Sequence, residues 1–163
     1  MISRDAVPFI GPQDQQRFER LLTWYATEGG LRAALLVDRT GRLLASVGET
    51  AFDATAFATL AAADFAAGDQ LALLLGEEEF AALYHQGENR SMYLSDVGGR
   101  AILAALFDGR TTLGMVRMKA RTIVPELAGI FAELAREDAR MRAQLDPGWA
   151  SDAETEIDRL FAD

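Results

Sequence analysis

Few residues in this chain combine the type and the spacing that chemistry at a site requires. His85 is the only histidine, whereas a metal centre normally recruits several His, Cys or carboxylate ligands. Two interpretations of His85 are open: a ligand in an unusual site, or a polar strand residue bonded to its neighbours. Ser91 and Ser95 lie nearby in sequence, but proximity on a hairpin does not by itself provide an activated nucleophile.

Two charged clusters also carry open interpretations. The acidic run Glu77–Glu79 is either a carboxylate set in a pocket or a solvated segment, because acid–base work needs a pocket that shifts pKa values. Arg117 and Arg121 are spaced to share a helix face, which is either a partner contact, such as an arginine finger on phosphate, or a solvated surface. The whole basic cluster comprises Arg110, Arg117, Lys119 and Arg121.

The standard catalytic and nucleotide-binding motifs are absent from the sequence. It has no glycine-rich loop before Gly-Lys-Ser/Thr, no Gly-x-Gly-x-x-Gly and no Gly-x-Ser-x-Gly, the patterns that cradle phosphates or expose a nucleophile. It also has no cysteine, which excludes thiol catalysis and Cys-zinc sites. The residues therefore favour a small interaction module over an enzyme, with no metal and no cofactor.

Composition narrows the class of partner. The chain has 163 residues, which fits one domain with a substantial core, and its formal net charge is −9. That charge argues against nucleic acid and anionic lipid, which both need clustered Lys and Arg, and it is compatible with a basic protein surface. The sequence has no signal-peptide core, and no uninterrupted apolar run reaches about 18 residues. We therefore expect a cytoplasmic protein with no membrane partner.

Hydrophobic periodicity and turn residues divide the chain into elements. Pro12 suits the first turn of a helix, Gly30 a left-handed helix end, and Gly41 a tight hairpin turn. Asp53 is a good N-cap, and Gly76 ends the helix that Asp53 opens. The pattern predicts helices over 12–28 and 53–75, and strands over 31–38, 42–48, 79–86, 90–97 and 101–107.

A long helix and a short tail complete the chain. The long helix carries an apolar stripe whose three- and four-residue spacing continues across Pro125, which predicts one helix kinked at that residue. Its heptad-like spacing permits a coiled coil or burial on a sheet, and we favour the sheet. Ser151 and Glu154 form a capping box for a short C-terminal helix. The apolar stripe consists of Leu113, Val116, Ala120, Ile123, Leu127, Ile130 and Leu134.

These elements predict an α/β (α+β) fold: a five-stranded, mostly antiparallel sheet with helices on both faces. Two helices share one face, and the Ala-rich helix takes the other. Strand 79–86 lies at one end of the sheet, where an edge can pair with a second copy. We expect a flexible N-terminus over 1–11, the domain over 12–140, and a linker with the short helix over 141–163.

The Ala-rich helix has few polar side chains. A helix that is apolar nearly all round is covered on both sides, and in so small a chain the sheet covers only one of them. We interpret the outward side, formed by Ala62, Ala63, Ala66 and Ala67, as a surface for another protein. The alternative is a core helix buried within a monomer.

Several stretches resemble the Roadblock/dynein light chain family over about residues 12–138. They are LRAALLVDRTGRLLASVG (31–48), the Ala-rich helix ending in LLLGEEEF (73–80), and ALYHQGENRSMYLSDVGGRAILAALF (82–107). Leu-Gly-Glu (75–77), His-Gln-Gly-Glu (85–88) and FDGRTTLGMVRMKA (107–120) resemble, more narrowly, the bacterial MglB branch, whose partner is a small Ras-like polarity GTPase, MglA.

The resemblance implies a profilin-like sandwich that forms a homodimer through the strand after the Ala-rich helix. Two copies then bind one MglA-like GTPase and stimulate its GTP hydrolysis by ordering its switch regions, without a nucleotide site or arginine finger of their own. On this resemblance the partner-binding residues are Thr59, Ala62, Ala63, Asp64, Ala66, Ala67 and Gln70. The dimer-interface residues are Phe80, Ala82, Tyr84 and Gln86.

Two other functions remain open at this point. A Roadblock scaffold, or an exchange-promoting partner, would bind a GTPase through the same apolar helix without accelerating hydrolysis. A small-molecule-binding or enzymatic α/β domain would instead need a deep pocket lined by convergent polar groups. Concentration at a cell pole is a further expectation from the resemblance.

Overall fold

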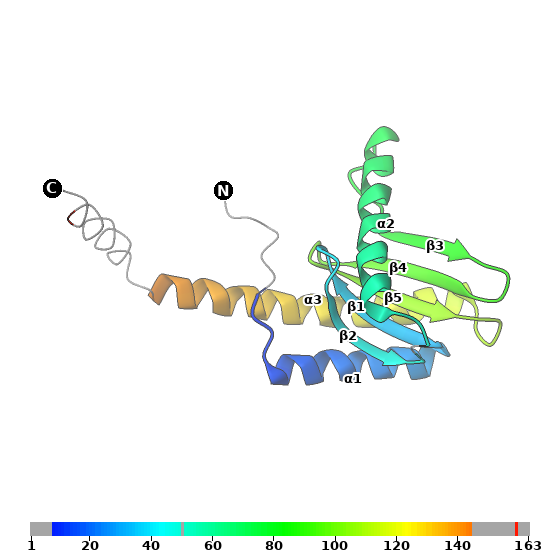
Figure 1. Cartoon of the computed structure of the whole chain (residues 1–163), viewed down its shortest axis with the longest axis horizontal. Coiled ribbons are helices and arrows are strands. Elements are labelled where there is room, and N and C mark those ends of the chain that lie inside the picture. Colours follow the sequence, from blue (N-terminus) through cyan, green and yellow to red (C-terminus); the bar gives the residue numbers. More distant parts are fainter. Residues whose placement is uncertain (1–7, 50, 145–158, 160–163) are drawn as a thin grey trace.

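The computed structural model describes residues 8–49, 51–144 and 159, and its element order is the one expected (Figure 1). Residues 1–7 of the flexible N-terminus expected over 1–11 lie outside the described residues, and so does the C-terminal helix expected near 151–161, apart from residue 159. The elements are α1 (Pro12–Gly29), β1 (Ala33–Asp38), β2 (Leu43–Gly48), α2 (Ala54–Leu74), β3 (Ala82–Gln86), β4 (Ser91–Val97), β5 (Ala101–Phe107) and α3 (Leu113–Gln144).

The five strands form one sheet in the order β2-β1-β5-β4-β3, and every neighbouring pair is antiparallel. The two apolar strands, β1 and β5, are central, because each is covered on both faces and paired on both sides. β3 lies at the end of the sheet, as predicted.

The helices cover both faces of the sheet. α1 and α3 share one face with a core that includes Phe18, Tyr25 and Leu127, and α2 packs on the other face around Phe65. The rings of Phe18 and Phe131 stack at 5.2 Å between α1 and α3. The predicted two-against-one arrangement of helices is confirmed.

The stripe of α3 is buried on the sheet, which decides between the sheet and a coiled coil for these residues. Val116, Ile123 and Leu127 are fully or almost fully buried. The helix is continuous through Pro125, as predicted, while the kink at that residue stays a prediction. α3 reaches Gln144, and its last turns are rich in Ala and Arg, which favour helix. The domain boundary expected at residue 140 stays a prediction.

Strand β3 is shorter than predicted. It begins at Ala82, so Phe80 lies before the strand and not within it. The physical reason is the path of the chain: α2 ends beyond the sheet edge (Figure 1), and residues 77–81 lead back to it. Just before β3, the Ala81 carbonyl accepts a hydrogen bond from the Asp96 N–H of β4 at 3.0 Å.

α2 has the ends that its sequence predicts. The Asp53 carboxylate accepts a hydrogen bond from the Ala56 N–H at 3.0 Å, and Gly76 follows the helix with φ of 81°. In length and composition α2 is also apolar enough to cross a membrane, the one such helix in the described part of the chain. Here its inner side packs on the sheet, Asp69 forms an ion pair with Arg39, and Asp64 lies within hydrogen-bond distance of His85.

Candidate functional site: a partner-binding surface

The inner side of α2 is built almost entirely from small residues at helical spacing. Its buried residues are Ala58, Ala61, Ala62, Phe65, Gly68 and Ala72. Ala62 therefore corrects the sequence interpretation, because its side chain is 7% exposed and belongs to the core under α2. It lies three residues before Phe65 and shares the inner face of the helix with that ring.

The other expected partner residues of α2 divide into an outer face and a flank. Asp64 is half-buried on the flank that faces β3. The outer face, which we define as Thr59, Ala63, Ala66, Ala67 and Gln70, is exposed along its length. Short side chains make this face smooth, so another backbone can approach it closely, as small residues permit between packed helices. The Thr59 hydroxyl donates to the Thr55 carbonyl at 3.2 Å.

Large apolar side chains border the outer face, and the sequence analysis did not single them out. Leu60 is 69% exposed near the start of α2. A second group lies where the helix extends past β3 (Figure 1), and we call it the leucine end: Leu71, Leu73, Leu74 and Leu75. Clustered exposed apolar residues mark interaction surfaces. The signal was present, because Leu60, Leu71 and Leu74 share the helix side of Ala63 and Ala67.

The free edge of β3 is the second part of the candidate site. Within the described sheet β3 pairs with β4 alone, and an edge strand presents backbone groups that another strand can bind. Tyr84 is 41% exposed and stacks on Phe107 at 6.2 Å, and Gln86 is exposed beside it. Ala82 is half-buried at the start of the strand.

His85 is a polar strand residue bonded to α2. Its Nε2 lies 2.6 Å from Asp64 Oδ2, so the pair joins the edge strand to the flank of the helix. Among the described residues no group of three or more His, Cys, Asp or Glu side chains is arranged to hold a metal ion. These contacts favour the bonded-strand interpretation of His85 over the metal-ligand interpretation.

Of the charged clusters of the sequence, the basic one lies away from the outer face, whereas Glu77–Glu79 directly follows the leucine end of α2. Glu77–Glu79 is exposed, and Arg117 and Arg121 are exposed on α3, in the opposite layer. Lys119 pairs with Glu28 at 3.4 Å. These positions are those of solvated surface groups.

Asp108 organises a charged cluster just after β5. It accepts the Arg110 N–H at 3.1 Å and the Arg32 guanidinium at 2.6 Å. The Arg110 N–H and the neighbouring Arg32 lower the pKa of Asp108 to about 2. Arg32 also pairs with Glu49 at 3.2 Å, so the cluster ties β5 to the segments that flank β1 and β2.

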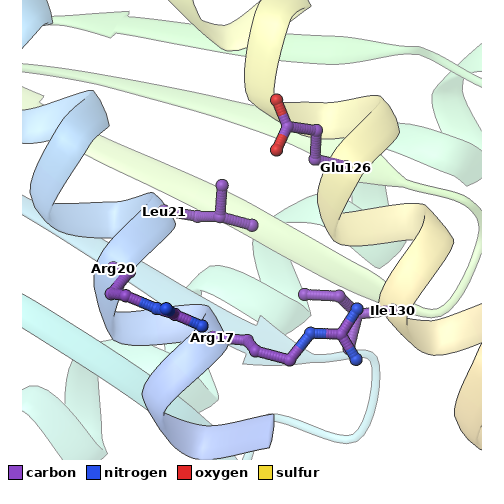
Figure 2. Close-up of a pocket in the computed structure, with 5 residues that line it drawn as sticks. All are labelled: Arg17, Arg20, Leu21, Glu126 and Ile130. Atoms are coloured by element: carbon purple, nitrogen blue, oxygen red, sulfur yellow. The ribbon is translucent and has the colours of Figure 1, made fainter.

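A groove lies between α1 and α3 (Figure 2). It has a volume of about 270 Å³ and is lined by Arg17, Arg20, Leu21, Glu126 and Ile130. Its polar groups do not converge: Arg17 is bound to Glu133 at 2.8 Å, and Glu126 lies apart from both arginines (Figure 2). The groove does not support the small-molecule-binding alternative.

The fold and the α2 surface define a Roadblock-type domain, and comparison with known proteins agrees. The family model for the Roadblock/LC7 domain matches residues 17–107, so the chain belongs to that family. A search of curated protein sequences gives no match.

Solved structures narrow the similarity to the MglB branch. Myxococcus xanthus MglB is 34% identical over 77% of this chain and 96% of its own, with a TM-score of 0.73. MglB from Thermus thermophilus is 33% identical over 80% of this chain and 98% of its own, with a TM-score of 0.71. Acanthamoeba castellanii profilin II shares the fold alone, at 12% identity, 68% and 96% coverage, and a TM-score of 0.52.

Proposed function

We propose that this chain is a non-enzymatic regulator of a small Ras-like GTPase of the MglA type, and that it stimulates GTP hydrolysis. The observation that carries the proposal is the outer face of α2, which is exposed, uncharged and rich in alanine in a chain 33–34% identical to MglB proteins. In our proposal this face binds the switch regions of the GTPase.

The chemistry of the surface fits a positioning role. The outer face offers alanines, Thr59 and Gln70, and none of these side chains is a general base or a phosphate-binding cation. Phosphoryl transfer depends mainly on positioning and electrostatic stabilisation. A surface that orders the GTPase's own catalytic residues can therefore accelerate hydrolysis without contributing a catalytic group.

We further propose that two copies of this chain bind one GTPase. The free edge of β3 and the leucine end support a symmetric pair, because edge strands add to one another and exposed leucines gain free energy when buried. An antiparallel pairing of two β3 strands has its two-fold axis perpendicular to the sheet. Both α2 helices then lie on one side and form a joint platform. We place the complex in the cytoplasm, concentrated at a cell pole.

Single-turnover GTP hydrolysis tests the proposal. The assay uses the small Ras-like GTPase encoded closest to this gene, with and without a molar excess of this protein. We expect acceleration by the wild-type chain and none by Ala67→Arg, because a long charged side chain keeps the partner backbone away from the outer face. Ala132→Arg is the matched control, since Ala132 is an exposed alanine on α3 in the opposite layer.

The outcomes separate the two functions that share this surface. Acceleration lost in Ala67→Arg and kept in Ala132→Arg supports an activator. A complex in light scattering without acceleration supports a scaffold or exchange role instead. Acceleration that survives Ala67→Arg contradicts the placement of the partner on α2.

A further inference from the structure

Arg39, in the turn between β1 and β2, joins three elements through one side chain. Its Nη1 donates to Asp69 Oδ2 of α2 at 3.1 Å, and its Nη2 donates to Asp96 of β4. The guanidinium also lies over the Phe65 ring, 4.7 Å from the ring centroid. The Arg39, Asp69 and Asp96 side chains are 22%, 28% and 17% exposed, so water screens these pairs less than it screens surface pairs.

We propose that Arg39 is a positioning residue: it holds α2 at one rotation on the sheet, so that the outer face is already formed when the partner binds. The proposal rests on the proposed function, because the partner is the GTPase of that function. Asp69 adjoins Gln70 and lies three residues after Ala66. We call the contacts of Arg39 with Asp69, Asp96 and the Phe65 ring the clamp. A rotation of the helix about its axis therefore moves the helix side of the clamp and the outer face together.

The sheet side of this clamp is rigid. Asp38 is 1% exposed and its carboxylate accepts four hydrogen bonds, from the N–H and hydroxyl of Thr40 and from the N–H and guanidinium of Arg42. The three bonds from the Thr40 N–H, the Thr40 hydroxyl and the Arg42 N–H fix the turn from which Arg39 projects, and none of the three needs the Arg42 side chain. Asp96 is held as well, because its Oδ2 accepts the Gly99 N–H at 2.9 Å.

On the helix side, by contrast, most buried side chains of α2 are too small to fix the rotation of the helix about its axis. Phe65 is the one large side chain among the buried residues of α2; the others are Ala or Gly. Small side chains form low ridges, so ridge-into-groove packing resists rotation weakly. The contacts of Arg39 with Asp69 and with the Phe65 ring therefore supply the orientation that packing alone does not.

The clamp contributes more to orientation than to global stability. Arg39 Nε and Asp69 Oδ1 are buried and have no hydrogen-bond partner in the described part of the chain. Each such atom carries a desolvation cost that offsets part of the gain from the ion pairs. A partner that covers the outer face excludes water and strengthens the remaining pairs, which links partner binding to the clamp.

The test compares Arg39→Met and Arg39→Lys with Arg42→Met in the full chain. Arg42 is the matched control, because it lies in the same turn, is 60% exposed and pairs with Asp38 within that turn. Hydrogen exchange read by mass spectrometry follows the amides of α2, and single-turnover hydrolysis gives the half-saturating concentration of each variant. The exchange measurement needs no GTPase.

In Arg39→Met we expect the α2 amides to exchange about tenfold faster, with α1 and α3 unchanged, since local opening is controlled by local contacts. Arg42→Met should leave α2 exchange at the wild-type rate. The α2 exchange rate of Arg39→Lys should lie between the rates of Arg39→Met and Arg42→Met, because one ammonium cannot reproduce the guanidinium contact with two carboxylates. The half-saturating concentration should rise about tenfold in Arg39→Met while the maximal rate is kept, which a mere loss of folded protein would not produce.

Equal α2 exchange in Arg39→Met and Arg42→Met would overturn the clamp. Faster α2 exchange with an unchanged half-saturating concentration would overturn its positioning role. A wild-type chain that neither binds nor activates the GTPase would remove the proposed function, and with it the partner-positioning role. The exchange measurement would still decide whether Arg39 holds α2.

Discussion

Leu74→Glu should weaken self-association strongly. The Leu74 side chain is 82% exposed at the leucine end of α2, and full burial of a leucine contributes about 1.5–3 kcal/mol. A symmetric dimer buries two copies of Leu74, so even the lower value of this range gives a loss of about 3 kcal/mol in the free energy of association. That loss raises the dissociation constant about a hundredfold. The buried carboxylates add a further cost because they are unpaired.

Sedimentation velocity over a dilution series measures this effect. A dimer has twice the 17.7 kDa mass of the chain, so the two species separate clearly. Met141→Glu is the matched control, because Met141 is 63% exposed on the last turns of α3, away from the leucine end. An unchanged dissociation constant in Leu74→Glu would refute the assignment of the leucine end to the dimer interface.

Three further predictions concern the fold. Tyr25→Phe should lower the free energy of unfolding in urea by about 1 kcal/mol, because the buried Tyr25 hydroxyl donates to the Val116 carbonyl at 3.1 Å; an unchanged midpoint would contradict that role. Gly41→Ala should cost more than about 1 kcal/mol, since Gly41 has φ of 93° and an added Cβ would lie 3.0 Å from Thr59 Cα, and a wild-type melting curve would disprove the close approach. The pKa of Asp108 falls from 3.8 to about 2 on folding, so its contribution to the free energy of unfolding is present above pH 4 and is lost as the pH falls toward 2. Asp108→Asn should therefore reduce the slope of the free energy of unfolding against pH in that range. An unaltered slope would count against the charged cluster around Asp108.

The fold could be predicted from the sequence because local signals and global packing agree. The unbroken apolar strand 101–107 indicated a central position, and the phase of the stripe across Pro125 indicated one helix. The start of β3 could not be predicted, because Glu79, Phe80 and Ala81 continue the alternation of the strand while the chain path uses them to return from the end of α2.

The candidate site was predictable in outline but not in its inner boundary. Composition showed that α2 is apolar nearly all round, and such a helix has no polar face to mark which side meets the sheet. The sequence pattern therefore does not distinguish Ala62, which is buried beside Gly41, from the exposed alanines of the helix. The sequence pattern also does not predict the Arg39 contacts, since Asp69 and Asp96 are far from Arg39 in sequence and only the fold brings them together.

A hydrogen-exchange footprint of this protein, in complex with the GTPase loaded with a non-hydrolysable GTP analogue, tests directly whether the partner binds the outer face of α2. We expect protection of α2 peptides that span Thr59 to Gln70, with no change in α1 or in the start of α3. Protection confined to the segment around Arg117 and Arg121, with α2 unchanged, would contradict this expectation and place the partner on the opposite layer.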